Sequence, residues 1–145
     1  MTRLFAFSDE VTAQVRSVPE IAERIRIRNE LIRDRFERDV GAAGWHRLRP
    51  GDVFVPMQGR RSIVVGSVLW SRDDLDILAK LASKDARDDT DIHIFNLDDV
   101  QSEDDLKRFM PRVPLPTKTP VVAEYVGSAL QRFADGPAVA TLLDN

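Results

Sequence analysis

The sequence predicts an α/β fold in which helices flank a mixed central sheet, and three stretches carry the prediction. A β-branched apolar run, Ile63–Trp70, is too short for a helix and has the composition of a buried strand. Ser71 and Asp74 follow it as a capping box that opens a helix. A second strand at 91–97 completes a strand–helix–strand unit, which implies parallel strands and a right-handed crossover.

The C-terminal part predicts a helix, a rigid loop and an antiparallel hairpin. Ser102 and Asp105 form another capping box, and Pro111 ends the short helix that they begin. A proline-rich loop leads to a strand at 121–126, a turn at Gly127 and Ser128, a return strand at 129–133 and a last helix that ends near residue 143.

The longest predicted element is a helix over residues 18–40, preceded by a short helix that begins at Ser8. Ser17 and Glu20 form its start signal, and the stretch Gly41-Ala42-Ala43-Gly44 ends it. An apolar stripe runs along one side and is expected to face the core; its members are Ile21, Ile25, Ile32, Phe36 and Val40. Ile27 and Leu31 widen this stripe beyond the arc that one sheet contact requires.

The remaining surface of this helix is rich in arginine and leaves two interpretations open. One is a solvated face crossed by i, i+4 ion pairs. The other is a second apolar face that contacts a protein partner or another copy of the chain. The residues of that predicted interface are Arg24, Ile27, Arg28, Leu31, Arg35 and Arg38.

One pairing remains ambiguous at this level. Val53–Val55 is a candidate strand, and Pro56 confines it to a sheet edge or ends it. Residues 53–57 therefore either form a hairpin with 62–70 or lie apart from the sheet. At the N-terminus, Leu4–Phe7 is either a short first strand or an anchor of the terminus.

Composition limits the possible functions. The 145 residues suggest a single domain, with a helical N-terminal extension over 1–50 and the core over 51–145. The chain has no cysteine and only two histidines, so we expect no disulfide, no thiol chemistry, no metal and no cofactor. No apolar run is long enough to cross a bilayer, so we expect a cytoplasmic protein without a membrane span. Its net charge of −3 does not provide the strong basic field of a nucleic-acid-binding protein.

The order of elements from Ile63 onward resembles the thioredoxin superfamily, which implies a three-layer sandwich. The resemblance rests on Trp70 at a strand end, the helix directly after it, and Thr119-Pro120 directly before a strand. In that family the strand is followed by Trp-Cys-x-x-Cys, facing a cis-proline. By position, Ser71 stands at the first cysteine and Asp74 at the second, while Pro120 matches the cis-proline. The implied binding groove consists of Trp70, Ser71, Arg72, Asp73, Asp74, Thr119 and Pro120.

The departures from the family decide which function is expected. A serine hydroxyl is not ionised by a helix N-terminus, and Asp73 and Asp74 oppose an anion there, so Ser71 is interpreted as a cap. We therefore expect a redox-inactive, non-catalytic module that binds or scaffolds protein, in which no residue is catalytic. Two alternatives are a structural subunit of a larger assembly and an enzyme that uses Ser71 or a cluster of aspartates; those aspartates are Asp88, Asp89, Asp91, Asp98, Asp99, Asp104 and Asp105.

Overall fold

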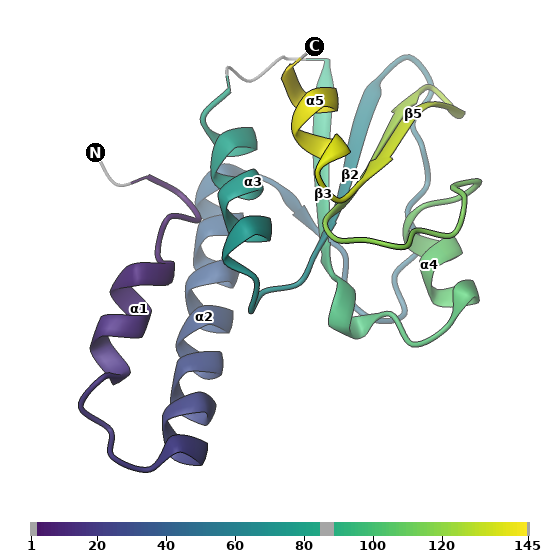
Figure 1. Cartoon of the computed structure of the whole chain (residues 1–145). Coiled ribbons are helices and arrows are strands. Elements are labelled where there is room, and N and C mark those ends of the chain that lie inside the picture. The colour runs from purple at the N-terminus through teal and green to yellow at the C-terminus, as the bar shows by residue number, and fades with distance from the viewer. Residues whose placement is uncertain (1–2, 85–88, 145) are drawn as a thin grey trace. The chain divides into compact units, whose positions relative to one another are not determined.

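The computed structural model describes residues 3–84 and 89–144, and it is a mixed α/β structure with a five-stranded sheet and five α-helices in those ranges (Figure 1). In chain order the elements are α1 Ser8–Val15, α2 Ile21–Ala43, β1 His46–Arg47, β2 Arg61–Ser67, α3 Arg72–Ala82, β3 Thr90–Asn96, the 3-10 helix η1 Leu97–Asp99, α4 Glu103–Phe109, β4 Val121–Val126, β5 Ala129–Asp135 and α5 Ala138–Asp144. None of the helices in the described ranges has both the length and the apolar character that a membrane crossing requires.

The chain divides into two compact units. The first contains the described residues up to Gly44 together with Leu69–Lys84, and the second contains Trp45–Val68 and the described residues from Asp89 onward. The helix α3 therefore groups with the N-terminal helices, whereas the sequence assigned it to the core that begins at residue 51.

In the first unit, α1 lies alongside α2 (Figure 1). The rings of Phe5 and Phe36 lie 6.1 Å apart. The buried Asp39 carboxylate accepts a hydrogen bond of 2.8 Å from the Phe5 amide, which fixes the N-terminal segment on α2. This segment contains no strand, so of the two possibilities for Leu4–Phe7, a first strand or an anchor of the terminus, the structure shows the anchor.

The helix starts differ from the predicted caps. Phe7 precedes α1 and Glu20 precedes α2, and neither side chain caps its helix. Ser8 is instead the first residue of α1, and Ser17 lies outside both helices. The long helix continues past the predicted end at residue 40 to Ala43, and of the predicted stop 41–44 only Gly44 lies beyond it, in a left-handed conformation with φ of 73°.

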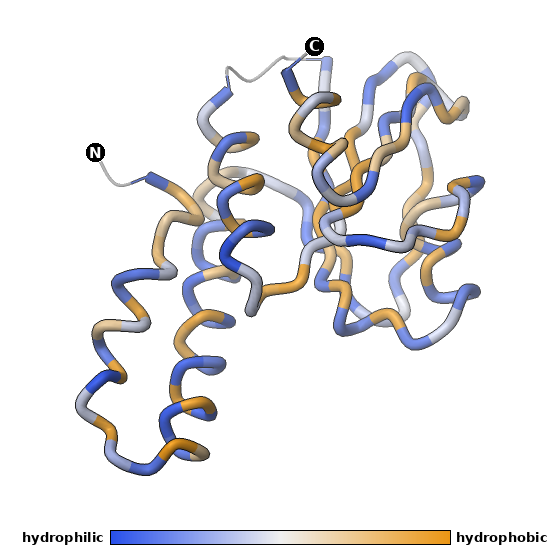
Figure 2. Tube along the Cα trace, in the orientation of Figure 1, coloured by the Kyte–Doolittle hydropathy of each residue, from blue (hydrophilic) through white to orange (hydrophobic). Residues whose placement is uncertain are grey.

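The predicted inner stripe of α2 is buried only in its C-terminal half. Ile32, Phe36 and Val40 are buried, whereas Ile21 and Ile25 are 69% and 53% exposed. Figure 2 shows hydrophobic and hydrophilic positions alternating along the whole of α2, so periodicity alone does not distinguish the covered half from the open one.

The second unit is built on the sheet, whose strand order is β1-β3-β2-β4-β5. Strands β1, β3 and β2 are parallel to one another. Strand β4 is antiparallel to β2, and β5 is antiparallel to β4, with a register shift in the β4–β5 pair between Glu124 and Tyr125. The predicted parallel pair and the predicted C-terminal hairpin are both confirmed. The predicted strand 63–70 is displaced, because β2 begins at Arg61 and ends at Ser67.

The structure also settles the ambiguous pairing. Residues 53–57 form no strand, and β2 pairs with β3 and β4 instead. The sheet edge beside β3 is occupied by the two residues of β1, which follow the long helix.

Each face of the sheet carries one helix of this unit. On one face, Leu106 and Phe109 of α4 pack with Val64, Phe95 and other residues of the main hydrophobic cluster. The rings of Phe95 and Phe109 stack at 4.7 Å. On the other face, Val139, Leu142 and Leu143 of α5 are buried.

Candidate functional site

The residues that match the thioredoxin motif form an ordinary helix start. Ser71 is the N-cap of α3, and its hydroxyl oxygen accepts a hydrogen bond of 3.3 Å from the Asp74 amide. The Asp74 side chain is buried at 1% exposure, while Trp70 is 61% exposed. Arg72 pairs with Asp9 at 3.1 Å, within the same unit. The predicted cap is therefore confirmed, and its hydroxyl is already used by the backbone.

The Thr119-Pro120 peptide bond is cis, as the family resemblance implied. Pro120 is buried directly before β4, and its carbonyl accepts a hydrogen bond of 2.9 Å from the Gly136 amide. Residues 70–74 and 119–120 belong to different compact units, so the groove between them stays a prediction.

The residues of the predicted helix interface occupy several environments. Arg24 donates to the Val18 carbonyl at 2.9 Å, and Arg35 donates two hydrogen bonds to Glu10 while lying over the Phe7 ring. The rest of the set is half-buried at Ile27, Arg28 and Leu31 and exposed at Arg38. Two arginines of the predicted interface, Arg24 and Arg35, thus stabilise the first unit.

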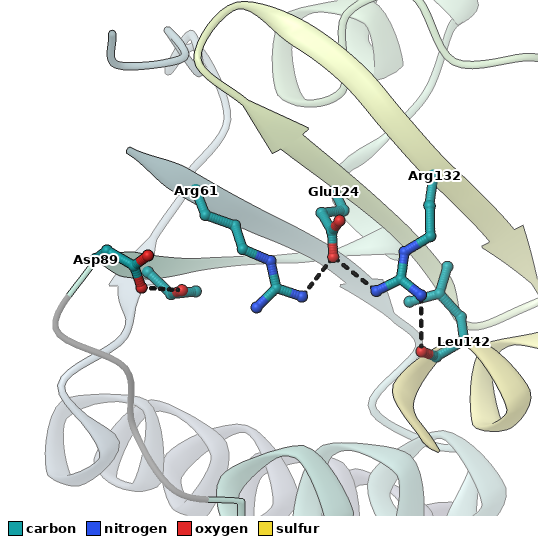
Figure 3. A network of polar contacts seen from close by, with 6 residues as sticks. Arg61, Asp89, Glu124, Arg132 and Leu142 are labelled. Atoms are coloured by element: carbon teal, nitrogen blue, oxygen red, sulfur yellow. Dashed lines mark hydrogen bonds and ion pairs between the residues drawn. The ribbon is translucent and has the colours of Figure 1, made fainter. Parts of the chain in front are cut away.

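A buried carboxylate between two arginines is the strongest polar feature of the second unit (Figure 3). Glu124, on β4, is 7% exposed, and its Oε2 accepts hydrogen bonds from Arg61 at 2.5 Å and from Arg132 at 2.8 Å. Arg132 also donates to the Leu142 carbonyl at 3.4 Å, which attaches α5 to the sheet.

This network keeps Glu124 ionised. Burial acts to raise its pKa, but the hydrogen bonds from Arg132 and Arg61 outweigh burial and hold the pKa below its ordinary value. A carboxylate that stays charged and fully paired is suited to holding structure, not to general acid–base chemistry. A local reading of the sequence places Glu124 on the strand surface; the signal for its burial is that an acid stands inside the apolar run of β4.

Two histidines meet at the edge of the sheet. His46 of β1 and His93 of β3 are paired in register, with their rings stacked 4.7 Å apart. Phe54 contacts His93 edge-on at 4.8 Å. Burial, together with the charge of His46, lowers the pKa of His93 to about 4, so its ring is neutral at physiological pH. His93 is therefore a packing residue on one face of its strand.

The aspartates do not gather into one site. Asp91 pairs with Arg60 at 2.7 Å, Asp99 lies 3.6 Å from Arg47, and Asp105 accepts from the Gln101 amide. Asp88 lies outside the described residues. Within the described ranges, no group of three or more histidine, cysteine, aspartate or glutamate side chains is arranged to hold a metal ion.

A shallow hollow of about 280 Å³ lies between η1, the start of α4 and the loop before β4. Most of its lining is apolar, and Glu103 is its single ionisable residue. The lining consists of Leu97, Val100, Gln101, Ser102, Glu103, Leu106, Leu115 and Pro116.

Comparisons with known proteins add little to these observations. No family model matches the chain, and no curated protein matches it. One solved structure, described as the crystal structure of a designed protein, is similar at 19% sequence identity with a TM-score of 0.42. The matched region covers 60% of this chain and 77% of the chain of that structure.

Proposed function

We propose that the chain is a thioredoxin-like, redox-inactive module that binds another protein. The strand order β1-β3-β2-β4-β5, with three parallel strands and an antiparallel C-terminal hairpin, supports the thioredoxin-like fold. The cis-proline that enters β4 and the helix that begins at Ser71 support it further.

The state of Ser71 carries the proposal. The superfamily's chemistry depends on a thiolate at the start of this helix, and the chain has no cysteine anywhere. The Ser71 hydroxyl caps α3, and Asp73 and Asp74 lie in the first turn of the helix, where they disfavour an anionic nucleophile. What remains of such a site is an exposed Trp70, a side chain suited to contact with protein.

The proposal is tested on the purified full chain in two ways. A disulfide reductase assay is expected to show no turnover, and turnover by the wild-type chain would overturn the redox-inactive part. Immobilised wild-type chain is expected to retain a defined protein from extract of its own cell. Trp70→Glu should lose that protein and Leu115→Glu, a matched exposed apolar site, should keep it. Equal retention by both variants would overturn binding through Trp70.

A second function, a structural subunit of a larger assembly, is favoured by one observation. Ile21 and Ile25 lie four residues apart on α2, and both are largely exposed. Two exposed apolar side chains on one helical face resemble the centre of a protein contact. A native complex whose mass falls when Ile21→Lys and Ile25→Lys are combined would support this function over the binding module.

A further inference from the structure

The edge of the sheet beside β3 is formed by residues 46–54, called the edge segment below. At its start β1 pairs with β3, and the Leu48 amide directly after β1 donates to the Ile94 carbonyl at 2.8 Å. At its end the Phe54 amide donates to the Arg108 carbonyl at 2.8 Å. The side chains of Leu48 and Phe54 are buried in the main hydrophobic cluster. Both ends of the edge segment are therefore attached to the body of the second unit.

One imidazole contacts both ends of the edge segment. The ring of His93 on β3 is stacked on the ring of His46 at the start of the segment, with centroids 4.7 Å apart. The ring of Phe54, at the end of the segment, contacts His93 at 4.8 Å with planes inclined by 66°. Phe54 in turn packs on Tyr125 of β4 at 5.1 Å. A charge on His93 therefore acts on both attachments at once.

The surroundings of His93 favour its neutral ring. Its Nδ1 atom is buried and has no hydrogen-bond partner in the described part of the chain. Of the charged groups that face the ring, His46 repels a positive charge on it and Asp91 attracts one. The Asp91 carboxylate is already engaged by Arg60, which donates to both of its oxygens at 2.7 and 2.9 Å. Tyr125 is neutral because burial raises its pKa, and burial also lowers the pKa of His93 to about 4.

We propose that uptake of a proton by His93 releases the edge segment from β3 while the rest of the sheet stays folded. A charged imidazole in the closed stack stays desolvated at Nδ1, whereas both of its nitrogens donate to water once the segment is released. The proton therefore binds the open form more tightly and shifts the equilibrium toward it. The rest of the sheet is held independently, because β2 forms seven register pairs with β3 and six with β4 that the opening leaves intact.

The opening uncovers the outer edge of β3. In the closed form β1 occupies this edge at His93 and Ile94. An uncovered strand edge is a surface that pairs with another extended chain, so the availability of this edge depends on pH. The opening is independent of the proposed binding role, because it uses neither Trp70 nor α2.

The pH interval follows from the pKa of His93 in the two forms. The pKa is about 4 in the closed form and takes the ordinary value of about 6.5 in the open form. The contribution of neutral His93 to the closed form is therefore fully present above about pH 6.5 and lost as pH falls toward 4. Between pH 7 and pH 5 the equilibrium constant for opening rises by at most about 20-fold, because solvent screening reduces the difference in pKa.

Native-state amide hydrogen exchange of the full chain, followed by NMR at pH 7 and pH 5, tests the opening. After correction for the intrinsic effect of pH on exchange, the Leu48 and Phe54 amides are expected to lose about 5–20-fold of their protection between pH 7 and pH 5. At either pH they should exchange faster than the amide of Val65 in the central strand β2. Low concentrations of denaturant should accelerate the Val65 amide alone, because local opening exposes little surface.

Two phenylalanine substitutions in the ring stack separate the proton from the packing. His93→Phe keeps an aromatic ring and removes the titration, so the protection of the Leu48 amide should no longer depend on pH. His46→Phe is the matched control and should keep most of the pH dependence, because burial lowers the pKa of His93 more than the charge of His46 does. His93→Leu repeats the test with a different shape where circular dichroism shows that the phenylalanine variant is not folded.

Three results would overturn the proposal. Protection of the Leu48 and Phe54 amides that stays constant between pH 7 and pH 5 excludes opening linked to a proton. Exchange of these amides at the rate of Val65, and with the same denaturant dependence, assigns the acid effect to unfolding of the whole unit. A pH dependence that persists without the imidazole at position 93 assigns the effect to another group.

Discussion

The ring of His93 lies stacked on the ring of His46, with centroids 4.7 Å apart and planes inclined by 26°. The stack joins a strand of two residues, β1, to the body of the sheet. The Nδ1 atom of His93 is buried and has no hydrogen-bond partner in the described structure. This environment disfavours the protonated form of His93, which makes this edge of the sheet sensitive to acid.

We expect the free energy of unfolding to fall as pH is lowered from about 6.5 toward 4. The pKa of His93 is about 4 in the folded chain and about 6.5 when unfolded, so the unfolded state takes up the proton first. The loss amounts to about 1–2 kcal/mol once solvent screening of the sheet edge is taken into account.

Denaturant unfolding of wild type and His93→Phe at pH 7 and pH 5 measures this loss. The phenylalanine keeps the ring contact with Phe54 and removes the titration, so the variant should lose less stability than wild type over this interval. The interval also lies above the range in which Glu124 takes up a proton, since the pKa of Glu124 is lowered. An NMR titration that places the pKa of His93 near 6.5 would contradict the account.

Glu124→Gln is expected to lower the free energy of unfolding by about 2–4 kcal/mol. The substitution keeps the shape of the side chain and leaves Arg61 and Arg132 without their shared counter-charge. Asp91→Asn, which breaks the more exposed pair with Arg60, is the matched control and should cost about 1 kcal/mol or less. Equal losses in the two variants, measured by denaturant unfolding, would show that the network is no stronger than a surface pair.

Gly66→Ala is expected to destabilise the sheet by about 1–3 kcal/mol or more. A Cβ at this position would lie 2.5 Å from Cζ of Phe95 and 2.8 Å from Cγ2 of Val121, both in the packed core. Gly41→Ala in α2 meets nothing within 4 Å and should stabilise the chain by roughly 0.5–1 kcal/mol. The difference between the melting temperatures of Gly66→Ala and Gly41→Ala measures the cost of a methyl group at position 66. A Gly66→Ala chain as stable as wild type would contradict the close approach of Phe95 and Val121 to Gly66.

The elements with strong local signals were predicted from sequence. The β-branched run became β2, the Ser71 and Ser102 caps open α3 and α4, and the C-terminal strands begin at Val121 and Ala129 as expected. Each of these depends on residues within a few positions of one another, so a window of sequence contains the information. The cis bond at Thr119-Pro120 came from the family resemblance and was also found.

The features that were missed depend on distant partners. Strand β1 is two residues long and exists because His46 and Arg47 pair with β3, which no local pattern indicates. The burial of Glu124 follows from Arg61 and Arg132, which reach it from neighbouring strands. The exposure of Ile21 and Ile25 also depends on residues distant in the sequence. Periodicity identifies the apolar side of a helix, but it does not show which part of that side other elements cover.

The binding role is tested most directly by site-specific photo-crosslinking in the protein's own cell. A benzophenone amino acid replaces Trp70 in one full-length chain and Leu115 in another, since both side chains are largely exposed. The account predicts a discrete crosslinked product with a second protein from position 70 and none from position 115. No product at position 70, or the same products from both positions, would contradict it.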